Sequence, residues 1–320
     1  MNALLALVLT AADPAGSTAK IGVALGTVEL KPAAAPEYAA AAAGAAVEND
    51  VWVRTGADGR AALDFADGTE LRLDQNTELH VQGPRKVVLK AGVVYARIAQ
   101  KPDLFVLETK FAPMETSGGL FEVKFIHRDP NSPEFKKVSR TVTEIMTMEG
   151  KINVKSRKYA QIVTAGYHCD MVDSQLNTPD PNPNPMIMTA WVNPILAARG
   201  AAAGAEMQLR ADTYMSRLGQ TEQNDPCEAA LRGLGASAVP ALLDYFKFPA
   251  TTGDAPRRRA AARVLADVCP PSSADALLKL LKEADAEVKA SGVKGLQRLT
   301  GKDHGADEKA WAETIKGVRQ

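Results

Sequence analysis

The chain has 320 residues, more than one hydrophobic core usually serves, which predicts two domains. Hydrophobic residues make up 46% of the sequence and charged residues 24%, a composition typical of a folded globular protein that excludes disorder throughout. The 38 basic and 38 acidic residues give a formal net charge of zero. We expect no nucleic-acid partner, because non-specific binding to DNA or RNA relies on a broad positive field.

The first twelve residues, Met1–Ala12, are mostly apolar and have the length of the hydrophobic region of a secretory signal peptide. Thr10 and Ala12 are small residues at positions suited to cleavage, although no Lys or Arg precedes the apolar stretch. We expect a periplasmic or otherwise exported protein. The alternative is a cytoplasmic protein in which residues 1–12 form a buried strand or helix. No segment reaches about 18 apolar residues without a charge, so we expect no transmembrane span.

Residues 20–171 alternate between apolar and polar side chains and are punctuated by glycine. Asp67-Gly68 lies between the alternating segments 62–65 and 69–73, which predicts a hairpin with a type I′ turn. Further short strands are predicted at 77–81, 86–89, 93–98, 104–108, 120–125, 141–146, 152–154 and 161–163. We expect turns between them, including at Gly92 and at Glu149-Gly150. Strands at this spacing predict an all-β sandwich or roll.

Two stretches differ in composition from the strands. The alanine-rich residues 33–46 predict a surface insertion or a short helix. Prolines alternate with polar residues in 178–185, inside a linker predicted at 172–190, because alternating prolines disfavour helix and central strand. Apolar residues then recur at helical spacing, which predicts connecting helices over 191–224.

Residues 225–320 contain a segment that recurs. Leu231, Leu265 and Leu296 occupy equivalent positions, separated by 34 and 31 residues. A second helix with an apolar face is predicted after the first two copies, at 238–243 and 274–281. A helix pair that recurs about every 30 residues is typical of an α-solenoid, in which each pair buries its apolar face against its neighbours.

Clusters of metal-capable residues favour structural roles, and we expect no metal and no cofactor. His168-Cys169-Asp170 lie on one predicted strand, where neighbouring side chains point to opposite faces and cannot all bind one ion. Asp303, His304 and Asp307 are a second set of potential ligands. We expect instead that Asp307 caps a last helix and that Trp311 covers the end of the stack.

The three cysteines, Cys169, Cys227 and Cys269, match neither a disulfide framework nor a zinc-site spacing. We expect buried or free thiols. A disulfide between Cys227 and Cys269 is the alternative in an oxidising compartment.

Sequence motifs of enzymes are missing. The chain has no Gly-x-Ser-x-Gly, no Gly-x-x-x-x-Gly-Lys-Ser/Thr and no His-Glu-x-x-His, so we expect a non-catalytic protein. Arg257, Arg258, Arg259 and Arg263 are the candidate partner-binding residues, because they would form a basic stripe on one helix that suits an acidic partner. The alternative is the solvated outer face of a repeat.

The amino-terminal half resembles the FecR domain over most of residues 20–170. The likeness rests on an ordered series of short motifs at 26–28, 55–56, 67–71, 77–79, 89–92, 105–109, 121–123, 149–154 and 165–166. Family members have Gly-Thr-x-Phe where this chain has Gly119-Leu120-Phe121, and residues 131–135 add a polar insertion. The regulator that gives the family its name has a cytoplasmic anti-sigma region and a transmembrane helix, to which the resemblance does not extend.

Residues 225–318 resemble HEAT-type repeats, with 235–243 the best match. Such repeats imply protein–protein scaffolding. Together the resemblances predict a FecR-like β-sandwich or roll followed by a HEAT-like α-solenoid, in a non-catalytic protein of the bacterial cell envelope that binds a partner protein or an envelope component. The alternative function is a signalling protein that senses a ligand or glycan and is related to FecR-type anti-sigma regulators. The oligomeric state is not indicated by the sequence.

Overall fold

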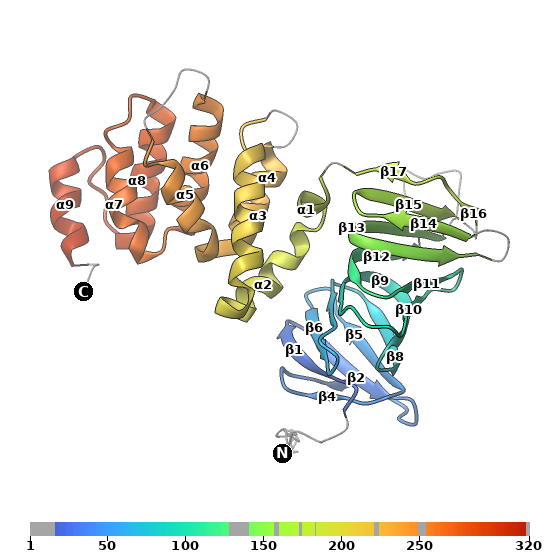
Figure 1. Cartoon of the computed structure of the whole chain (residues 1–320). Helices are drawn as coiled ribbons and strands as arrows, with labels where there is room; N and C mark the ends of the chain where they lie inside the picture. The colour runs from blue at the N-terminus through green and yellow to red at the C-terminus, as the bar shows by residue number, and fades with distance from the viewer. Residues whose placement is uncertain are drawn as a thin grey trace, which may run out of the picture. The chain divides into compact units, whose positions relative to one another are not determined.

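The computed structural model of the chain describes residues 17–127, 141–156, 160–172, 175–182, 184–220, 224–248 and 254–317. The chain divides into two compact units, residues 1–185 (the β unit) and residues 186–320 (the α unit). Strands occupy the first and helices the second (Figure 1), which confirms the predicted order of a strand-rich part followed by a helical part. The signal peptide predicted at 1–12 and the insertion at 131–135 lie outside the described residues.

The strands of the β unit are short except for two. They are β1 (Ala19–Leu25), β2 (Val28–Pro32), β3 (Ala39–Ala40), β4 (Ala46–Val47), β5 (Val51–Thr55), β6 (Arg60–Phe65), β7 (Glu70–Leu73), β8 (Glu78–Gly83), β9 (Lys86–Ile98), β10 (Phe105–Glu108), β11 (Pro113–Thr116), β12 (Gly119–His127), β13 (Thr141–Lys155), β14 (Ala160–Thr164), β15 (Tyr167–Val172), β16 (Gln175–Leu176) and β17 (Asp180–Pro181).

These strands pair in two sheets. Sheet A has the order β4-β1-β6-β7-β9-β12-β13-β15, and β16 and β17 both pair with β15. Sheet B has the order β3-β2-β5-β8-β9-β10-β11-β13-β14. All of these pairs are antiparallel except β9 with β10, which is parallel. The long strands β9 and β13 therefore belong to both sheets.

Each shared strand changes sheet at a glycine. In β9, residues up to Ala91 pair with β8 in sheet B, and residues from Gly92 pair with β12 in sheet A. In β13 the change follows Gly150. Gly92 has a φ of 96° and Gly150 a φ of 76°, values that favour glycine. The predicted turns at these positions are wrong, because the glycines bend continuous strands without ending them.

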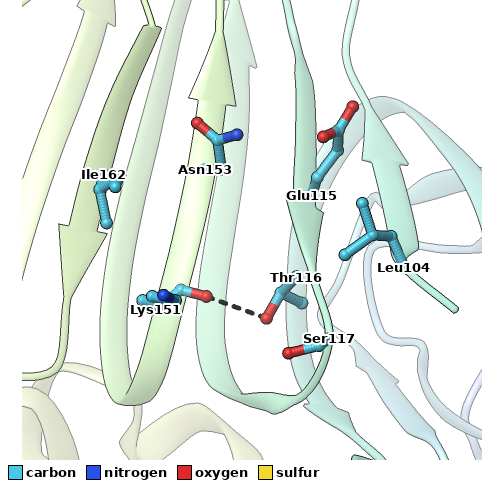
Figure 2. Close-up of a pocket in the computed structure, with 7 residues that line it drawn as sticks. All are labelled: Leu104, Glu115, Thr116, Ser117, Lys151, Asn153 and Ile162. Carbon is cyan, nitrogen blue, oxygen red and sulfur yellow. Dashed lines mark hydrogen bonds between the residues drawn. The ribbon is translucent and has the colours of Figure 1, made fainter. Parts of the chain in front are cut away.

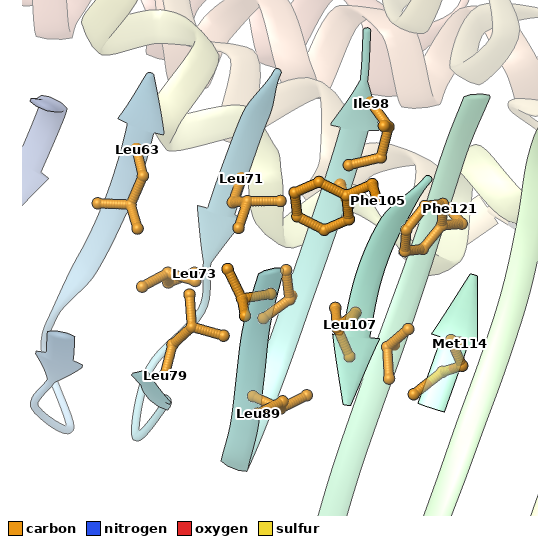
Figure 3. Packing of buried hydrophobic residues seen from close by; sticks show 14 of the residues in the cluster. Leu63, Leu71, Leu73, Leu79, Leu89, Ile98, Phe105, Leu107, Met114 and Phe121 are labelled. Atoms are coloured by element: carbon orange, nitrogen blue, oxygen red, sulfur yellow. The ribbon is translucent and has the colours of Figure 1, made fainter. Parts of the chain in front are cut away.

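The core of the β unit lies between the two sheets (Figure 3). Leu63 of sheet A and Leu79 and Leu89 of sheet B are fully buried in it. Phe65 of β6 meets Phe105 of β10 edge to face, with 6.3 Å between the ring centroids. Side chains from both sheets thus pack face to face, as alternation in the sequence requires.

The predicted hairpin at Asp67-Gly68 joins β6 and β7, but its turn is not type I′. Among the described residues of this turn only Gly68 has a positive φ, 88°. The Gly68 amide donates to the Phe65 carbonyl at 3.1 Å, and the Phe65 amide donates to the Thr69 carbonyl at 2.9 Å. This is a three-residue loop, a type I turn followed by a glycine bulge. Asp67 stabilises it by accepting the Thr69 amide at 2.8 Å.

Two predictions for irregular segments differ from the structure. Residues 33–46 contain the two-residue strand β3 and the first residue of β4, and no helix. Part of the predicted linker pairs with the sheet as β16 and β17. Asn182 is buried there, and its side-chain nitrogen lies 2.8 Å from Met146 Sδ. Pro181 fits this position because a proline can lie in an edge strand, where its missing N–H is not needed.

The α unit consists of short helices joined by tight turns. Its α-helices in the described residues are α1 (Pro185–Met188), α2 (Asn193–Arg199), α3 (Gly204–Arg217), α4 (Asn224–Leu234), α5 (Val239–Tyr245), α6 (Ala255–Val268), α7 (Ala274–Leu280), α8 (Ala286–Thr300) and α9 (Glu308–Lys316). None of the described helices combines the length and the apolarity that a membrane crossing needs.

The even-numbered helices form a row in which α2 contacts α4, α4 contacts α6 and α6 contacts α8. Helices α3 and α5, and α7 and α9, contact each other beside this row. Leu231, Leu265 and Leu296 are fully buried on α4, α6 and α8 respectively. The spacing in the sequence therefore places these leucines on successive helices of one row. The row begins with α2, earlier than residue 225, because α2 packs against α4 as the later helices do.

Candidate binding site on the β unit

The four arginines of the predicted basic stripe bind groups of their own chain. Arg258 is 5% exposed, and its guanidinium lies 2.5 Å from the Glu283 carboxylate. Arg259 pairs with Asp285 at 2.8 Å. Arg263 pairs with Glu228 at 2.5 Å, and Arg257 donates to the Leu218 carbonyl at 3.1 Å. The arginines thus contact neighbouring segments of the α unit, and their role in binding an acidic partner stays a prediction.

Glu228 on α4 is an acidic centre of this network. It accepts hydrogen bonds from Arg263 of α6 at 2.5 Å and from Arg232 at 2.8 Å. Burial raises the pKa of Glu228, but the hydrogen bonds from Arg263 and Arg232 outweigh it and hold this pKa below its usual value. A second carboxylate, Asp267 of α6, binds Arg232 at 2.8 Å and Lys294 of α8 at 3.0 Å. These charges therefore stabilise the row of helices.

The candidate metal ligands are held apart or have structural partners. Within the described ranges, no group of three or more His, Cys, Asp and Glu side chains could hold a metal ion. Asp307 accepts the Ala310 amide at 3.1 Å and so caps α9 as predicted. Trp311 is fully buried, and its ring N–H donates to the Gly305 carbonyl at 2.9 Å. His304 lies 2.8 Å from the Thr314 hydroxyl.

All three cysteines are free, so the alternative of a Cys227–Cys269 disulfide is wrong. Cys169 and Cys227 are buried, and burial raises the pKa of each thiol to about 11. A thiol with so high a pKa stays protonated near neutral pH, and a protonated thiol is a poor nucleophile. These cysteines therefore pack as small apolar side chains.

The outer face of sheet B carries cross-strand ion pairs. Its charged side chains alternate along the strands with buried residues such as Val53 and Leu79. Four such pairs in the described residues are Glu29–Arg54 at 2.7 Å, Glu78–Lys90 at 2.8 Å, Glu108–Lys86 at 3.1 Å and Glu115–Lys155 at 2.6 Å. Trp52 stacks on His80 between them, with ring centroids 4.3 Å apart. Most of this face is therefore a closed layer of partnered side chains.

A hollow of about 230 Å³ lies at the β14 end of this face (Figure 2). It is formed by β11, β13, β14 and the residue before β10. Its lining residues are Leu104, Glu115, Thr116, Ser117, Lys151, Asn153 and Ile162.

Two exposed apolar side chains stand at opposite ends of this hollow. Leu104 is 49% exposed and Ile162 is 56% exposed, and in Figure 2 the strands that carry the polar lining residues lie between them. The Thr116 hydroxyl bonds the Lys151 carbonyl at 2.9 Å, which ties β11 to β13 beneath the hollow. Protein interfaces combine apolar and polar surface, and this hollow offers both.

The hollow offers both polar and apolar groups to a binding partner. The Ser117 hydroxyl accepts from the Gln100 amide at 3.2 Å, and no histidine or cysteine is among the lining residues. In the described residues, Lys151 and Asn153 have no ion pair or side-chain hydrogen bond, so both can bind a polar group of a partner. An apolar side chain between Leu104 and Ile162 would complete such a contact.

The sequence predicts the strands that carry this hollow but not the hollow itself. Segments 104–108 and 161–163 are predicted as strands, and alternation places Ile162 on the face opposite the buried Val163. Alternation cannot show that β14 and residue 104 lie on the same face of sheet B. The intervening strands β11 and β13 bring them there. That depends on the non-local order of sheet B.

Comparison with known proteins gives one family. Residues 52–153 match the family described as FecR protein, and this segment includes all the lining residues of the hollow except Ile162. Two crystal structures of a candidate anti-sigma factor from Parabacteroides distasonis, at 2.50 and 1.65 Å resolution, are similar at 14% identity with a TM-score of 0.38. The alignment covers 44% of this chain and 64% of those chains, slightly less than two thirds of their length. No curated protein matches. The FecR domain is thus identified for residues 52–153 of the β unit.

Proposed function

We propose that the chain is a non-catalytic binding protein of the cell envelope, whose β unit recognises a partner protein through the hollow between Leu104 and Ile162. The observation that carries this proposal is the pair of large apolar side chains, each about half exposed, at the ends of a polar surface. The FecR match supports it, because the resemblance implies a regulatory protein and the matched segment forms most of the hollow.

In this proposal the β unit is a FecR-like sandwich and the α unit is a HEAT-like solenoid that presents a second docking surface. The two-sheet pairing with a core between the sheets supports the first part. The row α2, α4, α6 and α8, with the equivalent leucines buried on the last three, supports the second. Ion pairs between successive helices hold such a row rigid, as a scaffold requires.

Site-specific photo-crosslinking tests the recognition site. A photoreactive amino acid replaces Leu104 or Ile162 in the full chain produced in its native cells, and Lys20, which is exposed on β1, serves as the control position. We expect the same adduct from positions 104 and 162 and none from position 20. Adducts that do not differ between the three positions, or no adduct from 104 and 162, would contradict the proposal.

Fractionation tests the cell-envelope location. A tagged full-length chain is separated into envelope and cytosolic fractions, and its intact mass shows whether Met1–Ala12 has been removed. We expect the processed chain in the envelope fraction. An intact amino terminus in the cytosol would instead indicate an intracellular scaffold.

The FecR match also favours a second function, a sensor related to FecR-type anti-sigma regulators whose β unit binds a small ligand or glycan. A ligand that binds only the folded protein stabilises it by mass action, by about 2.7 kcal/mol at a hundred times its dissociation constant. Melting temperatures measured with a panel of envelope glycans separate the two functions. A shift that Asn153→Ala abolishes would favour the sensor.

A further inference from the structure

Among the described residues, strand β14 is an edge strand of sheet B. It pairs with β13 on one side, and no strand in the described part of the chain pairs with the other. An open edge presents unpaired backbone N–H and C=O groups, which are a template for a further strand. Proteins often block such an edge with charges or proline, and β14, with the sequence Ala-Gln-Ile-Val-Thr, has neither.

The hydrogen-bond register fixes which residues of β14 face outward. The Ala165 amide donates to the Gly150 carbonyl at 3.1 Å, in the register that continues along β14 and β13. Bonded positions in an antiparallel pair recur at every second residue, so Gln161 and Val163 bond to β13. The backbone groups of Ala160, Ile162 and Thr164 therefore point away from the sheet, available to a new strand.

Side chains at this edge indicate the chemistry of the incoming strand. Ile162, at the centre of β14, is 56% exposed and offers an apolar neighbour to a β-branched or aromatic residue. Lys151, opposite Thr164, is exposed and has no ion pair in the described residues. An added strand would lie about 10 Å from β13, a separation that a lysine and a glutamate side chain span together. An acidic residue opposite Thr164 would therefore reach Lys151.

A second copy of this chain fits the edge less well. Two β14 strands paired with each other would cover Ile162 but would bring no acidic side chain to Lys151, because β14 carries no charge. A peptide with an acidic residue satisfies both the apolar and the charged position. Charge complementarity thus favours a different protein as the occupant.

We propose that β14 accepts an extended segment of a partner protein as an additional strand of sheet B, with an apolar residue beside Ile162 and an acidic residue against Lys151. This inference rests on the proposed function and specifies how the partner of the hollow is held. Main-chain hydrogen bonds to Ala160, Ile162 and Thr164 supply affinity, and the two side-chain contacts supply specificity.

The experiment uses the crosslink from position 104 in the full chain, with substitutions on β14. Ile162→Pro removes the outward N–H, which bonds nothing within the sheet, and Ile162→Thr keeps that N–H on another β-branched residue. We expect Ile162→Pro to lower the adduct yield about fivefold, the effect of one lost hydrogen bond, and Ile162→Thr to lower it less. Unchanged melting temperatures show that the variants are folded.

Charge variants give a second readout that does not alter the backbone. Lys151→Glu should lower the adduct yield about twofold to fivefold, as loss of an exposed ion pair does, whereas Lys151→Arg should leave it unchanged. If the adduct forms but ignores Ile162→Pro and Lys151→Glu, strand addition is wrong and the proposed function stands. If no adduct forms from position 104, the proposed function itself fails. A dimer in solution that Ile162→Pro dissociates would identify a second copy as the occupant and overturn the inference.

Discussion

The strands shared by the two sheets pass from one sheet to the other at single glycines. At Gly92 a Cβ would lie 2.4 Å from Thr77 Oγ1 and 2.5 Å from Thr77 Cα. The Thr77 hydroxyl accepts the Val93 amide at 3.0 Å, so it cannot turn away without breaking a bond of the corner. No residue with a side chain fits there.

Gly92→Ala should therefore lower the free energy of unfolding by about 3 kcal/mol, because strain from the positive φ adds to crowding against Thr77. Gly166→Ala is the matched control: Gly166 has a φ of 84°, but a Cβ there would meet nothing within 4 Å. We expect a loss of about 1 kcal/mol from backbone strain alone. Urea unfolding followed by circular dichroism measures both, and equal losses would show that crowding at the corner has no role.

In the α unit, stability depends strongly on one residue, Glu228. Glu228→Gln should lower the free energy of unfolding by about 2 kcal/mol at pH 7, because Arg232 and Arg263 lose the charge they share. Glu313→Gln is the control, since Glu313 is 73% exposed in its pair with Lys316, and we expect a change within about 0.5 kcal/mol. Urea unfolding distinguishes them, and similar losses from both would contradict the central role of Glu228.

Because the pKa of Glu228 is lowered, we expect the free energy of unfolding to depend on pH in the acid range. A carboxylate whose pKa is lower in the folded protein contributes stability above its unfolded pKa, about 4.3 for glutamate, and loses it as the pH falls through the folded pKa. The free energy of unfolding should thus decrease below about pH 4.3, and less steeply in Glu228→Gln than in the original chain. Parallel pH profiles for the two proteins would refute this.

At the scale of elements, alternation and spacing predict most strands and helices, and errors arise where one residue type serves two purposes. Gly68 does mark a turn, whereas Gly92 and Gly150 bend strands that continue. Only the pairing partners on each side tell these cases apart, and those partners are distant in the sequence. The partners of the arginine run are also distant in the sequence. Arg258 binds Glu283, 25 residues away, and Arg259 binds Asp285, 26 residues away.

The predicted cap of α9 gives a test at this scale. Asp307→Ala should lower the free energy of unfolding by about 1 kcal/mol, because the first turn of α9 loses the acceptor of its Ala310 amide. Asp307→Asn keeps an acceptor, so its free energy of unfolding should remain within about 0.3 kcal/mol of that of the original chain. Thermal unfolding by calorimetry measures the difference. If asparagine is as harmful as alanine, the charge of Asp307 matters and not its capping bond.

At the scale of the whole molecule, stability relies on packing and ion pairs without covalent links. All three cysteines are free, and both units bury aliphatic and aromatic side chains. The division into two units is indicated by the change from period two to helical spacing in the sequence. The position of the hollow is not indicated by the sequence, because it depends on the order in sheet B of strands that are far apart in the chain.

The reactivity of the thiols tests whether the folded chain has no disulfide. A thiol reagent at pH 8 should react slowly with Cys169 and Cys227 in the folded chain, because burial raises the pKa of both to about 11. All three cysteines should react at once in denaturant. The melting temperature should be the same with and without a reductant. A melting temperature that falls on reduction would reveal a disulfide and contradict the free thiols.

The two long strands that serve both sheets also set the order in which the β unit can be completed. A ribosome that has made residues 1–140 has produced two unfinished sheets, and both await β13 at 141–155. Sheet A gains β15 and sheet B gains β14 only after that strand has been added. The segment matched by the FecR family ends at residue 153, inside this strand. Neither sheet can therefore be completed during synthesis until β13 has been made.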